Sequence, residues 1–333
     1  MNSDTESSMR MTAAKESGEP EEAVDNVSTD EIVGNSTNTK CGFVALIGAP
    51  NAGKSTLTNR LVGTKVSIVT RKVQTTRARI RGIAIFDETQ IVFVDTPGIF
   101  APKRRLDRAM VDAAWGGAAD ADLVVLLVDA QKGLTEDVQS ILKKLKDTKY
   151  TLALAINKMD LVRREELLKL TKDLTDEVQF DEVFYISAEK GQGTNELVDY
   201  LKARLPLSPW LYPEDQLTDA PMRHTAAEIT REKLFLRLHD ELPYATTVET
   251  TDWKVKKDKS VRVEQVIYVE RESQKKIVLG KKGDAVKSIS MSSRKELSEI
   301  LGVPVHLFLF VKVRERWGDD PERFREMGLD YIK

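Results

Sequence analysis

Residues 42–55 read Gly-Phe-Val-Ala-Leu-Ile-Gly-Ala-Pro-Asn-Ala-Gly-Lys-Ser. The first six residues are an apolar run of strand length, which predicts a buried β-strand. The next eight match the pattern G-x-x-x-x-G-K-[ST] and open a helical stretch. A strand, this pattern and a helix in direct succession predict a phosphate-binding loop. The context matters because the pattern by itself arises by chance in about 1% of chains of this length.

The residue types of this loop suit the phosphates of a nucleotide. Glycine lets the backbone curl so that successive N–H groups point at phosphate oxygens, and the helix N-terminus adds partial positive charge. Lys54 reaches the β- and γ-phosphates, and the Ser55 hydroxyl binds Mg²⁺. The residues that we expect to contact the nucleotide here are Gly48, Ala49, Pro50, Asn51, Ala52, Gly53, Lys54, Ser55 and Thr56.

From residue 41 onward, short strand-like runs alternate with amphipathic helical stretches such as Leu134–Leu145 and Arg164–Val178. This alternation predicts an α/β fold, a mostly parallel sheet with helices on both faces, over residues 41–205. The turn Asp87-Glu88-Thr89 joins two of the strands as a hairpin, so one strand should be antiparallel. The predicted strands are Gly42–Ile47, Arg81–Phe86, Gln90–Val94, Leu123–Val128, Thr151–Ile156 and Val183–Ile186.

The pattern breaks where Pro206, Pro209 and Pro213 fall within eight residues, which predicts a linker over residues 206–222. Beyond it, an αββααβ order of elements predicts a second, α+β domain over residues 223–333. Its predicted elements are a helix at Ala226–Leu242, strands at Tyr244–Thr250 and Arg262–Glu270, a short helix from Ser273, a longer helix to about Leu301 and a strand at Val305–Val313.

Three further motifs follow predicted strands. The first, Asp95-Thr96-Pro97-Gly98, offers a carboxylate that can hold Mg²⁺ through water and a glycine amide that can sense a γ-phosphate. The second, Asn157-Lys158-Met159-Asp160, offers an aspartate that can accept hydrogen bonds from guanine N1–H and N2–H₂, which adenine cannot donate. The third, Ser187-Ala188-Glu189, brings backbone amides near the guanine carbonyl. Each motif by itself is common as an ordinary strand-ending turn, but together they indicate a guanine-nucleotide site.

With Gln74-Thr75-Thr76-Arg77, these motifs resemble those of the translation-factor class of GTPases. Residues 65–77 are closely similar to the Era family, as are residues 241–244, 269–276 and 280–283. The resemblance covers residues 41–333 and implies a ribosome-assembly GTPase that hydrolyses GTP to GDP and phosphate with Mg²⁺.

The resemblance also implies how Mg²⁺ is held. It assigns Thr76 as the threonine that completes the metal shell, together with Ser55 and with Asp95 through water. Thr75 is the alternative to Thr76. Residues 1–40 depart from the family, whose members usually begin close to the first strand.

The position after Gly98 bears on hydrolysis. Many GTPases place a glutamine there to orient the attacking water, but this chain has Ile99. One interpretation is a GTPase that only binds; the other is that charge stabilisation comes from elsewhere. In related GTPases an asparagine in the phosphate loop helps hold K⁺, and Asn51 stands at the matching position. We therefore predict a slow basal rate, K⁺ as a candidate cofactor, and a catalytic set of Lys54, Thr76, Gly98 and Asn51.

The tetrad Gly280-Lys281-Lys282-Gly283 lies between two predicted helices of the second domain. A GxxG tetrad is by itself often a glycine-capped turn, but here the order of elements resembles a prokaryotic (type II) KH domain, whose GxxG loop meets an RNA backbone. Residues 252–295 contain thirteen Lys or Arg against six Asp or Glu. That excess favours phosphate contact. The predicted RNA-binding residues are Gly280, Lys281, Lys282, Gly283, Lys275, Lys276 and Lys287.

Composition narrows the remaining possibilities. The chain has 333 residues, 41% of them hydrophobic and 31% charged, and no apolar run approaches the roughly 18 residues of a membrane-spanning helix. A single cysteine excludes an intrachain disulfide and a cysteine-based zinc site, which favours a reducing, cytoplasmic location. Residues 1–40 contain nine acidic and three basic side chains and no aromatic residue, which predicts a disordered acidic tail rather than a targeting signal.

The predicted function is a GTP-switched RNA-binding protein that acts in small ribosomal subunit assembly; the resemblance implies the 3′ end of 16S ribosomal RNA as its target. One alternative is an RNA-binding protein with a structural guanine nucleotide. Another is a membrane-surface GTPase, peripheral at the inner face of the cell membrane, although acidic residues near Trp317, Phe324 and Met327 favour docking of that segment onto the protein itself. We expect a monomer with GTP as its one small-molecule substrate.

Overall fold

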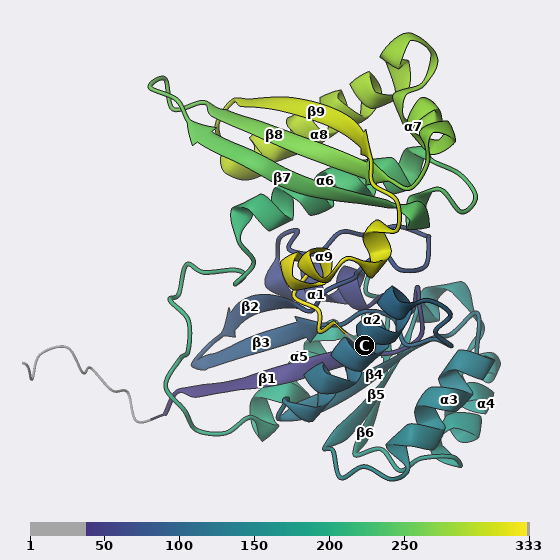
Figure 1. The fold of residues 1–333 in the computed structure, drawn as a ribbon. Coiled ribbons are helices and arrows are strands. Elements are labelled where there is room, and N and C mark those ends of the chain that lie inside the picture. Colours follow the sequence, from purple (N-terminus) through teal and green to yellow (C-terminus); the bar gives the residue numbers. More distant parts are fainter. Residues whose placement is uncertain (1–37, 332–333) are drawn as a thin grey trace, which may run out of the picture. The chain divides into compact units, whose positions relative to one another are not determined.

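The first sheet is built from strands β1 (Lys40–Ile47), β2 (Ile80–Phe86), β3 (Thr89–Asp95), β4 (Leu123–Asp129), β5 (Leu152–Asn157) and β6 (Glu182–Ile186). In the computed structural model, which describes residues 38–331, these strands lie in the order β2-β3-β1-β4-β5-β6 (Figure 1). Strand β2 is antiparallel to β3, and the other neighbouring pairs are parallel. This confirms the predicted mostly parallel sheet with one antiparallel strand.

Helices cover both faces of this sheet (Figure 1). On one face, Leu57 and Leu201 pack in a core with Leu46 of β1; on the other, Ile141 and Leu174 pack with Ile47. Strands β3, β4 and β5 are buried along their whole length because both of their faces are covered. The helices are α1 (Lys54–Val62) and α5 (Thr194–Arg204) on the first face, and α2 (Arg105–Ala119), α3 (Glu136–Leu145) and α4 (Arg164–Thr175) on the second.

The second sheet has the strand order β7 (Thr246–Val255), β8 (Val261–Val269), β9 (Val305–Val313), with β7 antiparallel and β9 parallel to β8. One face of it packs on helices through Ile229, Leu234, Val278, Ile289 and Leu297. The chain order is the predicted αββααβ of a KH domain. The elements are α6 (Met222–Arg237), β7 (Thr246–Val255), β8 (Val261–Val269), α7 (Glu272–Leu279), α8 (Asp284–Leu301) and β9 (Val305–Val313).

The predicted linker is held against the first sheet. Gln90 of β3 donates through its amide nitrogen to the carbonyl of Tyr212 and accepts backbone N–H groups from Leu211 and Tyr212. Leu207 and Thr218 add bridges to β1 and β2. The proline-rich segment is therefore packed rather than a free tether, and residues 38–331 belong to one compact unit.

Several boundaries differ from the predictions. Thr89 pairs with Phe86, so the hairpin turn is only Asp87-Glu88. Helix α6 ends at Arg237 because Leu238 turns to extended backbone, five residues before Pro243. Strand β7 runs on to Val255 through an irregularity after Thr250.

The segment after β9 packs on the first domain, as the sequence favoured. Trp317 and Phe324 are buried in a cluster with Leu106 and Met110 of α2. Phe324 belongs to the short helix α9 (Pro321–Glu326). Within residues 38–331, no helix is both long and apolar enough to cross a membrane. The predicted acidic tail, residues 1–40, lies outside the described residues up to position 37.

Candidate functional site

The loop between β1 and α1 has a backbone that side chains would obstruct. Gly53 has φ +104°, and a Cβ built there would lie 2.1 Å from Nδ2 of Asn157. Asn51 also has positive φ, at 64°. Helix α1 begins directly after Gly53, at Lys54. The sequence thus produces a curled loop that ends at a helix N-terminus, which is the geometry that binds phosphate.

Lys54 lies inside this loop. Its side chain is buried, and its ammonium group donates to the carbonyls of Gly48 at 3.0 Å and Ala49 at 3.1 Å. Burial lowers the pKa of Lys54 to about 8, an effect that the nearby Asp95 carboxylate partly offsets. The protonated ammonium is therefore poorly solvated and is poised for an anionic ligand.

Three oxygen-bearing side chains meet beside the lysine. The hydroxyls of Ser55 and Thr76 lie 2.8 Å apart, and Thr76 Oγ1 lies 3.5 Å from Oδ2 of Asp95. Asp95 is fully buried, which raises the pKa of its carboxyl group, and its Oδ1 has no hydrogen-bond partner among the described residues. Two hydroxyls and an unsatisfied carboxylate oxygen are hard donors of the kind that Mg²⁺ prefers, so the predicted metal set fits the ion.

Thr75, the alternative to Thr76, points elsewhere. Its hydroxyl donates to the carbonyl of Lys72 at 2.7 Å and lies 2.6 Å from the hydroxyl of Thr70. It is thus engaged within its own loop, whereas the hydroxyl of Thr76 lies beside Ser55.

The Asp95–Gly98 motif abuts the phosphate loop. A Cβ built on Gly98 would lie 2.9 Å from Cα of Pro50, and the N–H of Ile99 donates to the carbonyl of Gly48 at 3.0 Å. Only glycine permits this close approach. The Ile99 side chain is 5% exposed and packs in the core of the first domain. It therefore anchors the loop.

Asn157 joins three of the predicted motifs. Its amide nitrogen donates to the carbonyl of Ala52 at 2.8 Å. Its amide oxygen accepts the backbone N–H groups of Lys158 at 2.8 Å and Ala188 at 2.9 Å. The phosphate loop, the 157–160 motif and the 187–189 motif thus meet at one buried side chain.

Asp160 carries the carboxylate predicted to accept from guanine. Its Oδ2 lies 2.9 Å from the ammonium group of Lys190. Hydrogen bonds from Lys190 and Ser187 lower the pKa of the Asp160 carboxyl group, so it is an ionised acceptor at neutral pH.

Three residues of this site were missed in the sequence. Asp129, at the end of β4, forms a 2.6 Å ion pair with Lys158. Its signal is a carboxylate that directly ends a buried strand beside the strand ending at Asn157. Arg60 of α1 holds the carbonyls of Ala188 and Glu189, and Lys190 holds Asp160; neither has a local sequence signal, since each depends on a contact across the fold or a loop.

The predicted RNA-binding tetrad forms the turn between α7 and α8. Gly280 has φ +76°, and a Cβ there would lie 2.8 Å from the backbone nitrogen of Ala285. Lys281 and Lys282 are exposed, and Lys282 itself has φ 54°. Lys276 and Lys287 are exposed on the flanking helices, whereas Lys275 lies 3.7 Å from the carboxylate of Glu272. The turn thus exposes the ammonium groups of Lys281 and Lys282 to solvent on a tightly packed backbone.

Comparisons with known proteins agree with this geometry. Residues 43–158 match the family described as 50S ribosome-binding GTPase, and residues 241–318 match the KH domain family. The GTPase Era of Sinorhizobium medicae is 67% identical over 295 residues, which cover 89% of this chain and 95% of that protein. The GTPase Era of Agrobacterium fabrum is 67% identical over 297 residues, which cover 89% and 94%.

Solved structures extend the comparison to three dimensions. A crystal structure of Era in complex with MgGDPNP and nucleotides 1506–1542 of 16S ribosomal RNA is 38% identical, with a TM-score of 0.84, over 87% of this chain and 99% of that one. An Aquifex aeolicus Era variant bound to GDP·AlF₄⁻ has a TM-score of 0.83 over the same shares, also at 38% identity. Similarity on this scale, over nearly the whole of both proteins, shows that the chain belongs to the Era family of GTPases, enzymes that use guanine nucleotide and Mg²⁺ and carry a C-terminal KH domain.

Proposed function

We propose that this GTPase is a switch in the assembly of the small ribosomal subunit and that its KH domain binds the 3′ end of 16S ribosomal RNA. The observation that carries the proposal is the glycine-bounded turn with exposed Lys281 and Lys282, in a chain whose relative of known structure holds 16S nucleotides 1506–1542. The description of the wider GTPase family names the 50S subunit instead, so the subunit is a point for experiment.

In this proposal the phosphates of GTP lie in the loop of residues 48–56, where backbone N–H groups and Lys54 neutralise their charge. Ser55 and Thr76 would hold Mg²⁺ directly and Asp95 would hold it through water, which the close approach of their oxygens supports. When bound there, the ion would neutralise charge on the phosphates. Gly98 reports the γ-phosphate through its amide, because its backbone abuts the loop at Pro50.

The base is read by a second group of residues. Asp160 accepts from guanine N1–H and N2–H₂, and its ionised carboxylate supports that role. Asn157 positions the loops, and the ammonium group of Lys158 pairs with Asp129. Residues 187–189 place their backbone beside the guanine carbonyl; the N–H of Ala188 is held by Asn157 and that of Ser187 by the carbonyl of Gln192.

We also propose that K⁺ beside Asn51 supplies the charge stabilisation that Ile99 cannot. Asn51 donates its amide nitrogen to the carbonyl of Arg71 at 3.0 Å, which leaves its amide oxygen as the ligand atom. Basal turnover should be slow, roughly 10⁻⁴ to 10⁻² s⁻¹, without a water-orienting glutamine or an arginine finger.

The K⁺ proposal is tested by phosphate release in K⁺ and in Na⁺ at equal ionic strength. The parent should be faster in K⁺, and Asn51→Ala should remove the difference without weakening Mg²⁺·GTP binding. Identical parental rates in the two salts would exclude the cation, and a basal rate above about 1 s⁻¹ would reveal a catalytic group of another kind.

The proposed setting is the cytoplasm, with the protein as a monomer. Peripheral contact with the inner face of the cell membrane is the second candidate, but the C-terminal segment gives it little support. Trp317 and Phe324 are buried against α2, and Met327 is half-buried. The apolar side chains that would enter a bilayer are thus used within the protein.

Sequencing of RNA crosslinked to the protein in cells tests the target. Reads should concentrate at the 3′ end of 16S ribosomal RNA, and the variant with Lys281→Asp and Lys282→Asp should lose that peak. A peak on large-subunit RNA, or an unchanged peak in the variant, would contradict the proposal. Measurable GTP turnover in the parent that is lost in Lys54→Ala would support a GTPase and would contradict a protein whose nucleotide is only structural.

A further inference from the structure

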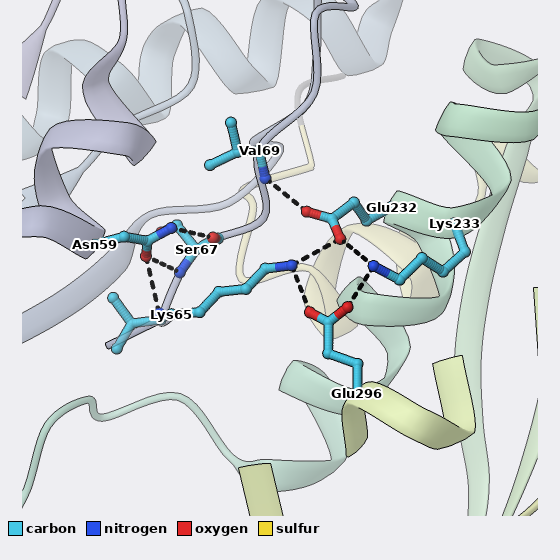
Figure 2. A network of polar contacts seen from close by, with 8 residues as sticks. Asn59, Lys65, Ser67, Val69, Glu232, Lys233 and Glu296 are labelled. Atoms are coloured by element: carbon cyan, nitrogen blue, oxygen red, sulfur yellow. Dashed lines mark hydrogen bonds and ion pairs between the residues drawn. The ribbon is translucent and has the colours of Figure 1, made fainter. Parts of the chain in front are cut away.

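Residues 65–77, here called the switch segment, are held by the KH domain as well as by their own domain. From its own domain, Asn59 of α1 accepts the N–H groups of Val66 and Ser67 at 2.9 and 2.8 Å (Figure 2). From the KH domain, Glu232 of α6 accepts the N–H of Val69 at 2.9 Å and pairs with Lys65 at 2.7 Å (Figure 2). The start of the segment is therefore fixed from both sides.

Ion pairs between two lysines and two glutamates also join the switch segment to the KH domain. Lys65 and Lys233 each contact both Glu232 and Glu296, which come from α6 and α8 (Figure 2). Glu232 is 5% exposed in its side chain, so its interactions are weakly screened by solvent. Further along the segment, Lys72 donates to the carbonyls of Phe235 and Leu238, each at 2.6 Å.

The end of the switch segment is held most directly by Arg231 of α6. Its side chain is 1% exposed, and it donates to the carbonyls of Gln74, at 3.4 Å, and Thr75. Glu228 pairs with the same guanidinium and orients it. A guanidinium suits this task because its rigid fork can donate to two acceptors at once. The residue that follows these two carbonyls is Thr76.

Arg77 fixes the other flank of Thr76. Its side chain is 2% exposed and donates to the carbonyl of Thr246 at 2.9 Å, at the start of β7. Its guanidinium lies 5.8 Å from the ring centroid of Phe235 and 5.4 Å from that of Trp317. Both neighbours of Thr76 are thus held by residues from beyond the first domain.

We propose that Arg231 is a positioning residue for GTP hydrolysis: helix α6 of the KH domain sets the backbone that presents the Thr76 hydroxyl to Mg²⁺. This rests on the role proposed above for Thr76. Without Arg231, the half-buried carbonyls of Gln74 and Thr75 lose a charged donor, so the segment relaxes and Thr76 is presented less often. Loss of Arg231 should not change GDP affinity, because Thr76 acts only when a γ-phosphate is bound.

The experiment uses the full chain and titrates Mg²⁺ against phosphate release at saturating GTP. Arg231→Gln should raise the Mg²⁺ concentration for half-maximal rate, or lower the rate, by about tenfold or more, as expected for loss of a charged hydrogen-bond donor. GDP affinity should stay parental. In a Thr76→Ala background Arg231→Gln should have no further effect, because both act through one hydroxyl.

Two more variants separate positioning from general stability. Arg231→Lys keeps the buried charge beside Glu228 but not the fork, so it should fold and still show most of the loss; it decides the matter if Arg231→Gln does not fold. Arg323→Gln is the matched control, since Arg323 is also buried and pairs with Glu249 and Glu326. It should lower the melting temperature but keep the parental Mg²⁺ dependence.

The outcomes are distinct. The positioning role would be overturned if Arg231→Lys kept the parental Mg²⁺ dependence of turnover. It would also be overturned if the effects of Arg231→Gln and Thr76→Ala on turnover were additive, or if Arg323→Gln changed the Mg²⁺ dependence as much as Arg231→Gln does. If Thr76→Ala itself had no effect on Mg²⁺-dependent turnover, the proposed function of Thr76 would fail first.

Discussion

At the scale of single residues, Lys54 illustrates how burial prepares a side chain for its ligand. Its ammonium group has lost water and gained only two carbonyl oxygens, so its pKa lies near 8 instead of 10.5. A bound phosphate restores a strong partner and favours the protonated form again. Binding above pH 8 must therefore take up a proton.

We accordingly predict that GTP affinity falls with rising pH, by about tenfold between pH 7 and pH 9, because an increasing share of the free protein has neutral Lys54. The measurement is a titration with a fluorescent GTP analogue at pH 7, 8 and 9. The control is Lys54→Met, which shares every other titrating group, the nucleotide included, and should bind weakly with a flatter profile. Matching slopes in parent and control would show that Lys54 does not titrate in this range.

Asp160 makes a second prediction at this scale. Asp160→Asn turns an acceptor into a donor opposite the guanine N2–H₂ group, so preference should move from GTP to xanthosine triphosphate, with GTP affinity lowered by about a hundredfold or more. Competition binding of the two nucleotides measures this. Asp147→Asn, a change at an exposed carboxylate on the same domain, should leave the preference unchanged. Equal GTP affinity in Asp160→Asn and the parent would remove Asp160 from base recognition.

Local motifs explain why these residues could be found in the sequence. Lys54 and Asp160 belong to contiguous patterns, so their neighbours identify them. Arg60 could not be found this way, because its partners Ala188 and Glu189 lie 128 and 129 residues away. A contact at that separation is fixed by how α1 packs against the sheet, which a local pattern does not encode.

At the scale of elements, the β1–α1 loop depends on Gly53 for both conformation and space. Gly53→Ala places a methyl group against Asn157 at a backbone angle that alanine rarely adopts. Nucleotide binding should be lost, because Asn157 also holds Ala52 and Ala188. Calorimetric titration with GDP checks this.

Gly63 provides the matched control for Gly53. It also has positive φ, at +79°, but a Cβ built there would have no other described atom within 4 Å. Gly63→Ala should cost about 1 kcal/mol of stability and leave GDP affinity parental. Retained GDP binding in Gly53→Ala would contradict the packed loop described here.

Elements with strong local patterns were predictable, and those shaped by distant partners were less so. Strand β9 has the predicted bounds, Val305–Val313, since its apolar residues begin after Pro304 and end before the charged stretch that starts at Arg314. The prolines predicted a linker from residue 206, shortly after α5 ends at Arg204, but the packing of that segment was not predicted. Gln90, whose side chain secures that segment, lies more than 120 residues earlier.

At the scale of the whole molecule, the contacts between the switch segment and α6 connect the nucleotide site of the first domain to the KH domain. Lys65 and Glu296 lie 231 residues apart, and Arg231 and Thr75 lie 156 apart. The sequence predicted the two domains and their motifs but gave no indication of this connection. Variants that test RNA binding apart from nucleotide binding should therefore be placed away from α6.

The tetrad between α7 and α8 is such a place. Lys281→Asp with Lys282→Asp reverses two exposed charges and should disable RNA binding while GTP affinity and basal turnover stay near parental. Any stimulation of hydrolysis by RNA should vanish, because RNA can act on the switch segment only after it docks. The control is Lys143→Asp with Lys144→Asp, which reverses two exposed charges at the end of α3.

The most direct test is a filter-binding titration of the 3′-terminal segment of 16S ribosomal RNA at several salt concentrations, with phosphate release measured alongside. The parent and the α3 control should bind alike. The tetrad variant should lose affinity, and its log–log salt slope should shrink by up to about 1.4 units, at roughly 0.7 per phosphate contact on a single strand. Parental affinity and slope in the tetrad variant would contradict RNA recognition by this turn and would direct attention to the basic cluster at residues 254–262.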